Sequence, residues 1–139
     1  MTNSTYKQTA IGFIPNDWEV KKISDGTTYV DYRGKTPQKT VSGIILITAR
    51  NIKVGYIDYD ISNEYISPED YSVVMSRGLP EIGDVLMTTE APMGNVAQVN
   101  KLNIALAQRV IKFRAKSNII TNDYLKYYFL SEKFQKLLD

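Results

Sequence analysis

The stretch Gly83–Val99, GDVLMTTEAPMGNVAQV, predicts a strand, a turn and a second strand. Val85 and Met87 are separated by the two-residue period of a strand. Ala91-Pro92-Met93-Gly94 then interrupts the pattern with turn-forming residues, and Val96 resumes it. We therefore expect a hairpin with an exposed turn, which serves either as a recognition loop or as an ordinary connection.

The hairpin and the segment after it carry side chains that hydrogen-bond to flat molecular edges. Glu90, Asn95 and Gln98 lie on or near the turn, and Gln108 and Arg109 follow in AQRVIKFR. Donors and acceptors held between strands are better suited to recognising another molecule than to breaking bonds in it.

Strands and helices are predicted on both sides of this hairpin. Strands are expected at 29–32, 44–48, 56–59, 84–89, 95–100 and 107–114. Ser67-Pro68-Glu69-Asp70 predicts a helix start, with Ser67 as the N-cap and an end near Arg77-Gly78. Strand runs without regular alternation with helices favour an α+β domain with a mostly antiparallel, curled sheet flanked by a few helices.

A final helix is predicted over 122–138, capped by Asn122 or by Thr121 before it. Its apolar face is wide and contains Leu125, Tyr128, Phe129, Leu130, Phe134, Leu137 and Leu138. Either this helix packs into the domain, or it is the first part of a longer helix.

Length and composition indicate one ordinary globular domain. The chain has 139 residues, of which 43% are hydrophobic and 23% charged. No apolar run reaches the ~18–20 residues of a membrane span, and the first residues lack the apolar core of a signal peptide. We therefore expect a cytoplasmic protein.

Most catalytic chemistry is excluded by residue type. The sequence contains no histidine and no cysteine, so imidazole catalysis and zinc sites built on these residues are impossible. The only Glu-x-Lys, Glu19-Val20-Lys21, lies too close to Asp17 for a nuclease metal site on separate strands. Phosphate-binding glycine motifs are absent as well. The sequence predicts a non-catalytic chain without a cofactor or metal.

Charge is segregated along the chain although the formal net charge is only +2. Two basic runs contain no acidic residue: 32–57, with Arg33, Lys35, Lys39, Arg50 and Lys53, and 91–122, with Lys101, Arg109, Lys112, Arg114 and Lys116. The segment 54–90 is strongly acidic. If the basic runs fold together, they form a positive surface of the kind that binds a phosphate backbone.

Several motifs, in this order, resemble a known family. They are IPNDWEVKKIS, YRGKTP, ILITARNIKVGYID, EYISPEDY, GDVLMTTEAPMGNVAQV, AQRVIKFR and YLKYYFLSEKFQKLL. Together they resemble the target recognition domain of the specificity subunit of type I restriction–modification systems, over Ile14 to Leu138.

The resemblance implies a domain that binds one half of a split DNA target without an active site of its own. It also implies a methyltransferase (modification) subunit and a restriction subunit as partners. A complete subunit resembles two such domains joined by long spacer helices. We expect residues 1–139 to form one domain, with a core at about 14–121 and a C-terminal helix leading towards a missing spacer. The chain would then be an excised domain or a half-subunit. It would also have a second specificity domain as a possible partner, or associate with itself through that helix.

Two functions remain open at this level. The first is sequence-specific binding of double-stranded DNA, with contacts from Arg33, Lys35, Thr36, Arg50, Asn51, Lys53, Thr89, Glu90, Met93, Asn95, Gln98, Gln108 and Arg109. Among these, the cations suit phosphate or guanine, the amides suit adenine, and Glu90 suits cytosine. The alternative is a protein-interaction module that uses the C-terminal helix and the ten tyrosines.

Overall fold

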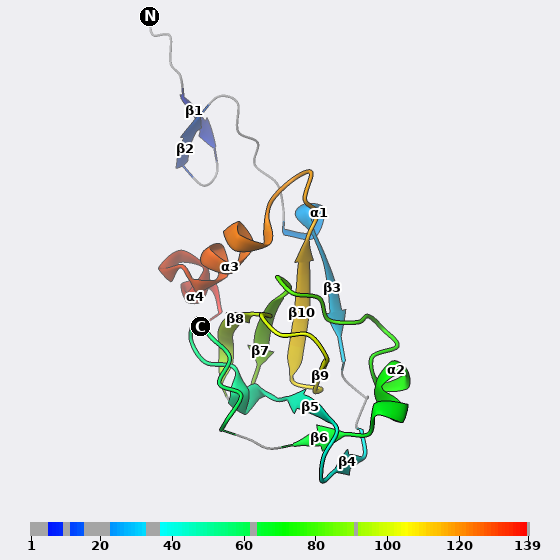
Figure 1. The fold of residues 1–139 in the computed structure, drawn as a ribbon. Helices are drawn as coiled ribbons and strands as arrows, with labels where there is room; N and C mark the ends of the chain where they lie inside the picture. Colours follow the sequence, from blue (N-terminus) through cyan, green and yellow to red (C-terminus); the bar gives the residue numbers. More distant parts are fainter. Residues whose placement is uncertain are drawn as a thin grey trace, which may run out of the picture.

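The chain folds into two packed β-sheets with short helices around them (Figure 1). The strands are β1 (Tyr6–Thr9), β2 (Gly12–Pro15), β3 (Thr27–Asp31), β4 (Lys39–Thr40), β5 (Ile44–Ile47), β6 (Tyr65–Ile66), β7 (Val85–Thr89), β8 (Met93–Gln98), β9 (Ile104–Leu106) and β10 (Val110–Ala115). The helices are α1 (Ile23–Gly26), α2 (Tyr71–Val74), α3 (Asn122–Leu130) and α4 (Glu132–Leu137), with 3-10 turns η1 (Ala49–Asn51) and η2 (Pro68–Asp70). This computed structural model describes residues 6–9, 12–15, 23–32, 37–61, 64–90 and 92–138.

The two larger sheets share one hydrophobic core. The first has the strand order β3-β10-β7-β8, the second β4-β6-β5-β9, and β1 and β2 form a separate hairpin. All pairs are antiparallel except β5 with β9. Leu86 and Val110 from the first sheet pack in one cluster with Leu46, Ile66 and Leu106 from the second. The predicted α+β fold with mostly antiparallel strands is confirmed.

Strand β7 is buried on both faces, which explains its apolar sequence. Leu86 faces the core between the sheets, while Val85 and Met87 lie in a second cluster beneath α3. The predicted hairpin is confirmed, but β8 begins at Met93 rather than Asn95, because Met93 already pairs with Thr89 across an irregular register.

The chain passes from the second sheet to the first at residues 107–109. The sequence predicts one strand over 107–114, but β9 ends at Leu106 and β10 begins at Val110. Between them the Val110 N–H donates to the Ala107 carbonyl at 3.3 Å, which closes a turn. The predicted strand is therefore confirmed as β10 except for its first three residues, and Gln108 and Arg109 lie on a turn instead.

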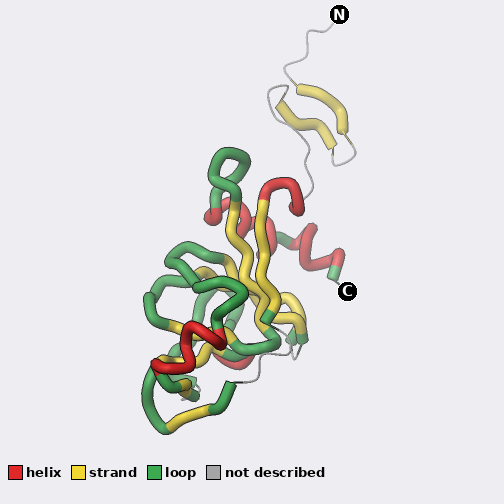
Figure 2. Tube along the Cα trace, turned by 90° about the vertical axis from the view of Figure 1, so that its right-hand side faces the viewer, coloured by secondary structure: helices red, strands yellow, loops and turns green. Residues whose placement is uncertain are grey.

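The strand predicted at 56–59 is also wrong, because the chain folds back on itself there. The Lys53 N–H donates to the Tyr56 carbonyl at 2.9 Å, and Gly55 has a φ of 93° that suits this tight turn. Only an isolated bridge joins Ile52 and Ile57. Loops and turns of this kind cover much of the lower part of the molecule in Figure 2.

The predicted helix start at Ser67 is confirmed. Its Oγ accepts a hydrogen bond from the Glu69 N–H at 3.2 Å, and Pro68 opens the first turn. The helix ends at Val74, earlier than predicted, and the Gly78 N–H closes the following turn on the Met75 carbonyl at 3.0 Å.

The single helix predicted over 122–138 is wrong, because Ser131 divides it into α3 and α4. Ser131 has an extended backbone with a ψ of 150°, and its Oγ accepts from the Phe134 N–H at 3.2 Å. Leu125 and Phe129 of α3 are buried against β7 and β8. Of the two alternatives for this region, packing into the domain is what the structure shows.

Candidate nucleic-acid interface

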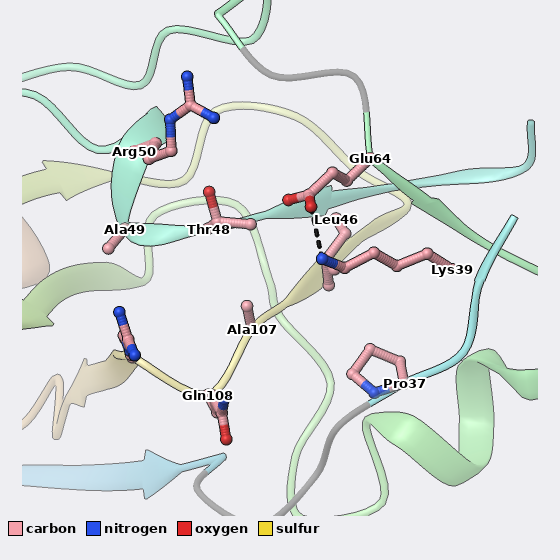
Figure 3. A pocket seen from close by; sticks show the side chains of 10 residues that line it. Pro37, Lys39, Leu46, Thr48, Ala49, Arg50, Glu64, Ala107 and Gln108 are labelled. Atoms are coloured by element: carbon pink, nitrogen blue, oxygen red, sulfur yellow. Dashed lines mark hydrogen bonds and ion pairs between the residues drawn. The ribbon is translucent and has the colours of Figure 1, made fainter. Parts of the chain in front are cut away.

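A groove lies beside the turn that joins β9 to β10 (Figure 3). It has a volume of about 430 Å³ and is lined by Pro37, Lys39, Leu46, Thr48, Ala49, Arg50, Glu64, Ala107, Gln108 and Arg109. A hollow of about 370 Å³, lined by Thr89, Glu90, Gln108 and Arg109, adjoins it. Five of the predicted contact residues therefore come together here from three distant segments: Arg50, Thr89, Glu90, Gln108 and Arg109.

Arg50 projects from η1, directly after strand β5. Its side chain is exposed and forms no ion pair with any residue in the described ranges. A guanidinium in this state is available to a phosphate or a base edge.

Asn51 holds the turn that presents Arg50 and is not itself accessible. Its Oδ1 accepts from the Thr48 N–H at 2.9 Å and the Thr48 hydroxyl at 3.0 Å, and its Nδ2 donates to the Asp58 carbonyl at 2.9 Å. The residue is 0% exposed. We therefore assign Asn51 to the support of the groove rather than to its surface.

Arg109 and Glu90 meet at the junction of the two hollows. The Thr89 N–H donates to the Arg109 carbonyl at 3.1 Å, which fixes the two backbones side by side. The Arg109 Nε lies 3.0 Å from the Glu90 Oε1, and both side chains are largely exposed.

A second ion pair lies at the other side of the groove. The Lys39 Nζ is 2.5 Å from the Glu64 Oε1, as the dashed line in Figure 3 marks. Neither residue is among the predicted contacts. The position of Lys39 in the first basic run could have indicated its place in the groove. Glu64 reaches the groove because β6 pairs with β4, and no sequence pattern predicts that pairing.

Two other predicted amides make structural contacts instead of pointing freely outward. The Asn95 Nδ2 donates to the Ile52 carbonyl at 3.0 Å and ties β8 to the loop after η1. The Gln98 Nε2 donates to the Gly83 carbonyl and to the Asp123 Oδ1, each at 3.0 Å. We leave both amides out of the proposed interface.

Two of the remaining predicted contacts, Met93 and Lys53, are not part of the groove lining. Met93 is 58% exposed at the start of β8, and Lys53 is half-buried. Arg33, Lys35 and Thr36 fall outside the described residues, although Pro37, which follows them, lines the groove.

The second basic run does not form one positive surface, because two of its cations are used internally. Arg114 binds the buried Asp84 through Nε at 2.8 Å and Nη2 at 2.9 Å. The Lys112 Nζ lies 3.6 Å from the same carboxylate, and both of these residues are almost fully buried. Of this run, Arg109 is the cation that reaches the groove.

This buried cluster sets the ionisation of its members. Burial by itself raises the pKa of the Asp84 carboxyl, but hydrogen bonds from Arg114 and the Glu81 N–H, and the charge of Lys112, hold that pKa below its ordinary value. Burial also lowers the pKa of the Lys112 ammonium. Asp84 is therefore ionised and serves as an anchor of the first sheet.

The described part of the chain contains no cluster of three or more carboxylates placed to hold a metal ion. None of its helices combines the length and the apolar character that crossing a membrane requires. A groove with an apolar lining, three cations, two carboxylates and an amide is typical of a recognition domain.

The chain belongs to the type I restriction modification DNA specificity domain family, whose model matches residues 15–139. The resemblance found in the sequence is thereby confirmed.

Two similar proteins of Methanocaldococcus jannaschii are specificity subunits of type I restriction enzymes. The chain is 28% identical over 146 aligned residues to the type I restriction enzyme MjaVIII specificity subunit, covering 98% of this chain and 33% of the relative. It is 29% identical over 139 residues to the MjaIX specificity subunit, covering 96% of this chain and 31% of the relative. The chain thus spans about a third of the length of the relatives it matches.

A solved structure supports the fold. The structure, described as the basis of complex assembly and conformational transition of the type I R-M system, matches with a TM-score of 0.61 at 14% identity. The match covers 88% of this chain and 28% of the solved one, and at this identity it concerns the fold alone.

Proposed function

We propose that the chain binds double-stranded DNA in a sequence-specific manner through the groove between η1 and the 107–109 turn. The observation that carries this proposal is the convergence of Arg50, Gln108, Arg109 and Glu90 from three separate segments on one groove. Donors and acceptors on a rigid frame match the distinct patterns that base pairs display in the major groove.

The residues of the groove divide into two kinds of contact. Arg50, which has no ion pair with a described residue, suits a phosphate and would fix the position of the chain on the duplex. Gln108 is exposed on the turn and carries an amide that can pair with both N6 and N7 of adenine. Apolar lining from the half-buried Ala107 offers a surface for a thymine methyl group or a sugar.

We infer that this activity belongs to a larger assembly. We infer that residues 1–139 act as one target recognition domain that reads half of a split target, without catalysis of their own. The methyltransferase and restriction subunits are the expected partners, since the similar full-length relatives are specificity subunits of type I restriction enzymes. A cellular DNA target also implies a cytoplasmic location.

The test is a selection from randomised DNA duplexes, followed by titration of the selected duplex and a scrambled one over a range of salt concentrations. We expect one short enriched motif and binding that weakens steeply with salt, because phosphate contacts release counterions. Since one domain reads only half a target, we expect dissociation constants on the order of micromolar. Equal binding to selected and scrambled duplexes, or salt-insensitive binding, would contradict the proposal.

A further inference from the structure

Arg109 and Glu90 form an ion pair on the rim of the groove. Its Nε–Oε1 distance is 3.0 Å, and the side chains are 54% and 62% exposed. Thr89 and Arg109 are joined through backbone and hydroxyl, because both the Thr89 N–H and its Oγ1 donate to the Arg109 carbonyl, at 3.1 and 3.4 Å. Glu90 directly follows β7 and Arg109 directly precedes β10, so the pair lies next to the hydrogen-bonded ends of two adjacent strands.

The charge environment distinguishes Arg109 from Arg50. A phosphate that approached Arg109 would also approach the carboxylate of Glu90 and be repelled by it. Arg50 forms no ion pair with a carboxylate among the described residues, and Glu64 of the same groove is paired with Lys39. A phosphate contact therefore fits Arg50. Arg109 instead fits a partner that offers acceptors to its guanidinium and, beside them, a donor to the Glu90 carboxylate.

A base edge with two acceptors beside a donor is such a partner. A G·C pair presents the guanine O6 and N7 acceptors and, next to them, the N4 amino donor of cytosine in the major groove. An A·T pair places a donor between two acceptors, so a two-donor guanidinium fork finds only one of them in reach.

We propose that Arg109 and Glu90 together read one G·C pair, with the guanidinium donating to guanine and the carboxylate accepting from cytosine. This inference rests on the proposed DNA-binding function and assigns these two side chains as its specificity determinants. In the absence of DNA, the two groups neutralise each other across 3.0 Å, so neither is left without a partner.

The test repeats the duplex selection at low salt with the full chain and the variants Arg109→Gln and Glu90→Gln. Lys116→Ala serves as the control, because Lys116 is exposed beyond the far end of β10. We expect the parent and the control to select the same motif with a G·C pair at one position. In each glutamine variant, the preference for G·C over the other base pairs falls about 5- to 140-fold at that position and stays unchanged at the other positions.

Two results would overturn the inference while leaving the proposed function intact. One is an unchanged motif in both variants. The other is tighter binding of Glu90→Gln to every duplex alike, which would show that Glu90 only weakens a phosphate contact of Arg109. If the parent enriches no motif at all, the proposed function fails together with the inference, so the two failures are distinguishable.

Discussion

Asn51 illustrates how a residue type that suits base reading can serve the scaffold instead. Its amide makes hydrogen bonds to Thr48 and Asp58, and these bonds set the turn from which Arg50 projects. The sequence predicts a polar surface near this point but does not tell which neighbour turns inward. Burial decides that, and burial depends on the Asp58 backbone, seven residues further along the chain.

Asp84 likewise shows that a charge counted along the sequence need not lie on the surface. It is 1% exposed and is held by Arg114 and Lys112, two cations of the second basic run. Removing one partner of a buried ion pair leaves the others uncompensated, and the cost is typically about 3–5 kcal/mol.

We therefore expect Asp84→Asn to lower the free energy of unfolding by about 3–5 kcal/mol at neutral pH, as measured by urea denaturation. The folded-state pKa of Asp84 is lowered, so its contribution is fully present above the unfolded value of about 3.9 and is lost as the pH falls through the folded value. The parent should lose this stability in acid, and the variant should show a flatter dependence there. Parallel pH profiles for the two proteins would contradict the anchoring role of Asp84.

At the scale of elements, local patterns predict what local interactions determine. The hairpin of β7 and β8 and the Ser67 cap follow from residues within a few positions of one another. The late start of β10 does not, because it depends on the crossing between the sheets at 107–109, where the Ala107 N–H still donates to the Ile47 carbonyl of the second sheet at 3.0 Å. That same crossing creates the groove. The sequence therefore predicts individual contact residues better than it predicts the groove in which they meet.

The turn of β8 gives a prediction at this scale, with a matched control. Gly94 and Gly55 have φ values of 90° and 93°, but a Cβ on Gly94 would lie 2.7 Å from the Leu138 Cδ1, whereas one on Gly55 meets nothing within 4 Å. Both alanine variants should lose about 1 kcal/mol or more of folding free energy through backbone strain. The two losses should be similar in urea denaturation, because the Leu138 Cδ1 is the far end of a flexible side chain that can move away from the new methyl group. A much larger loss for Gly94→Ala would show that the Leu138 side chain is fixed against this turn.

For the whole molecule, charge segregation predicts the interface only in part. Lys39 and Arg50 from the first basic run and Arg109 from the second reach the same groove. Lys112 and Arg114 turn into the first sheet. The family, by contrast, is evident from the order of the motifs along the chain, since that order reflects the whole fold rather than any single contact.

The proposed function requires that this groove, and not a general positive charge, contacts DNA. The most direct measurement is the salt dependence of duplex binding for Arg50→Ala beside Lys116→Ala, two variants that each remove one exposed cation. If Arg50 contacts a phosphate, its variant should bind more weakly and with a salt slope reduced by about one unit, while the Lys116 variant keeps the slope of the parent. Equal slopes for all three proteins, or an equal reduction in both variants, would contradict the account.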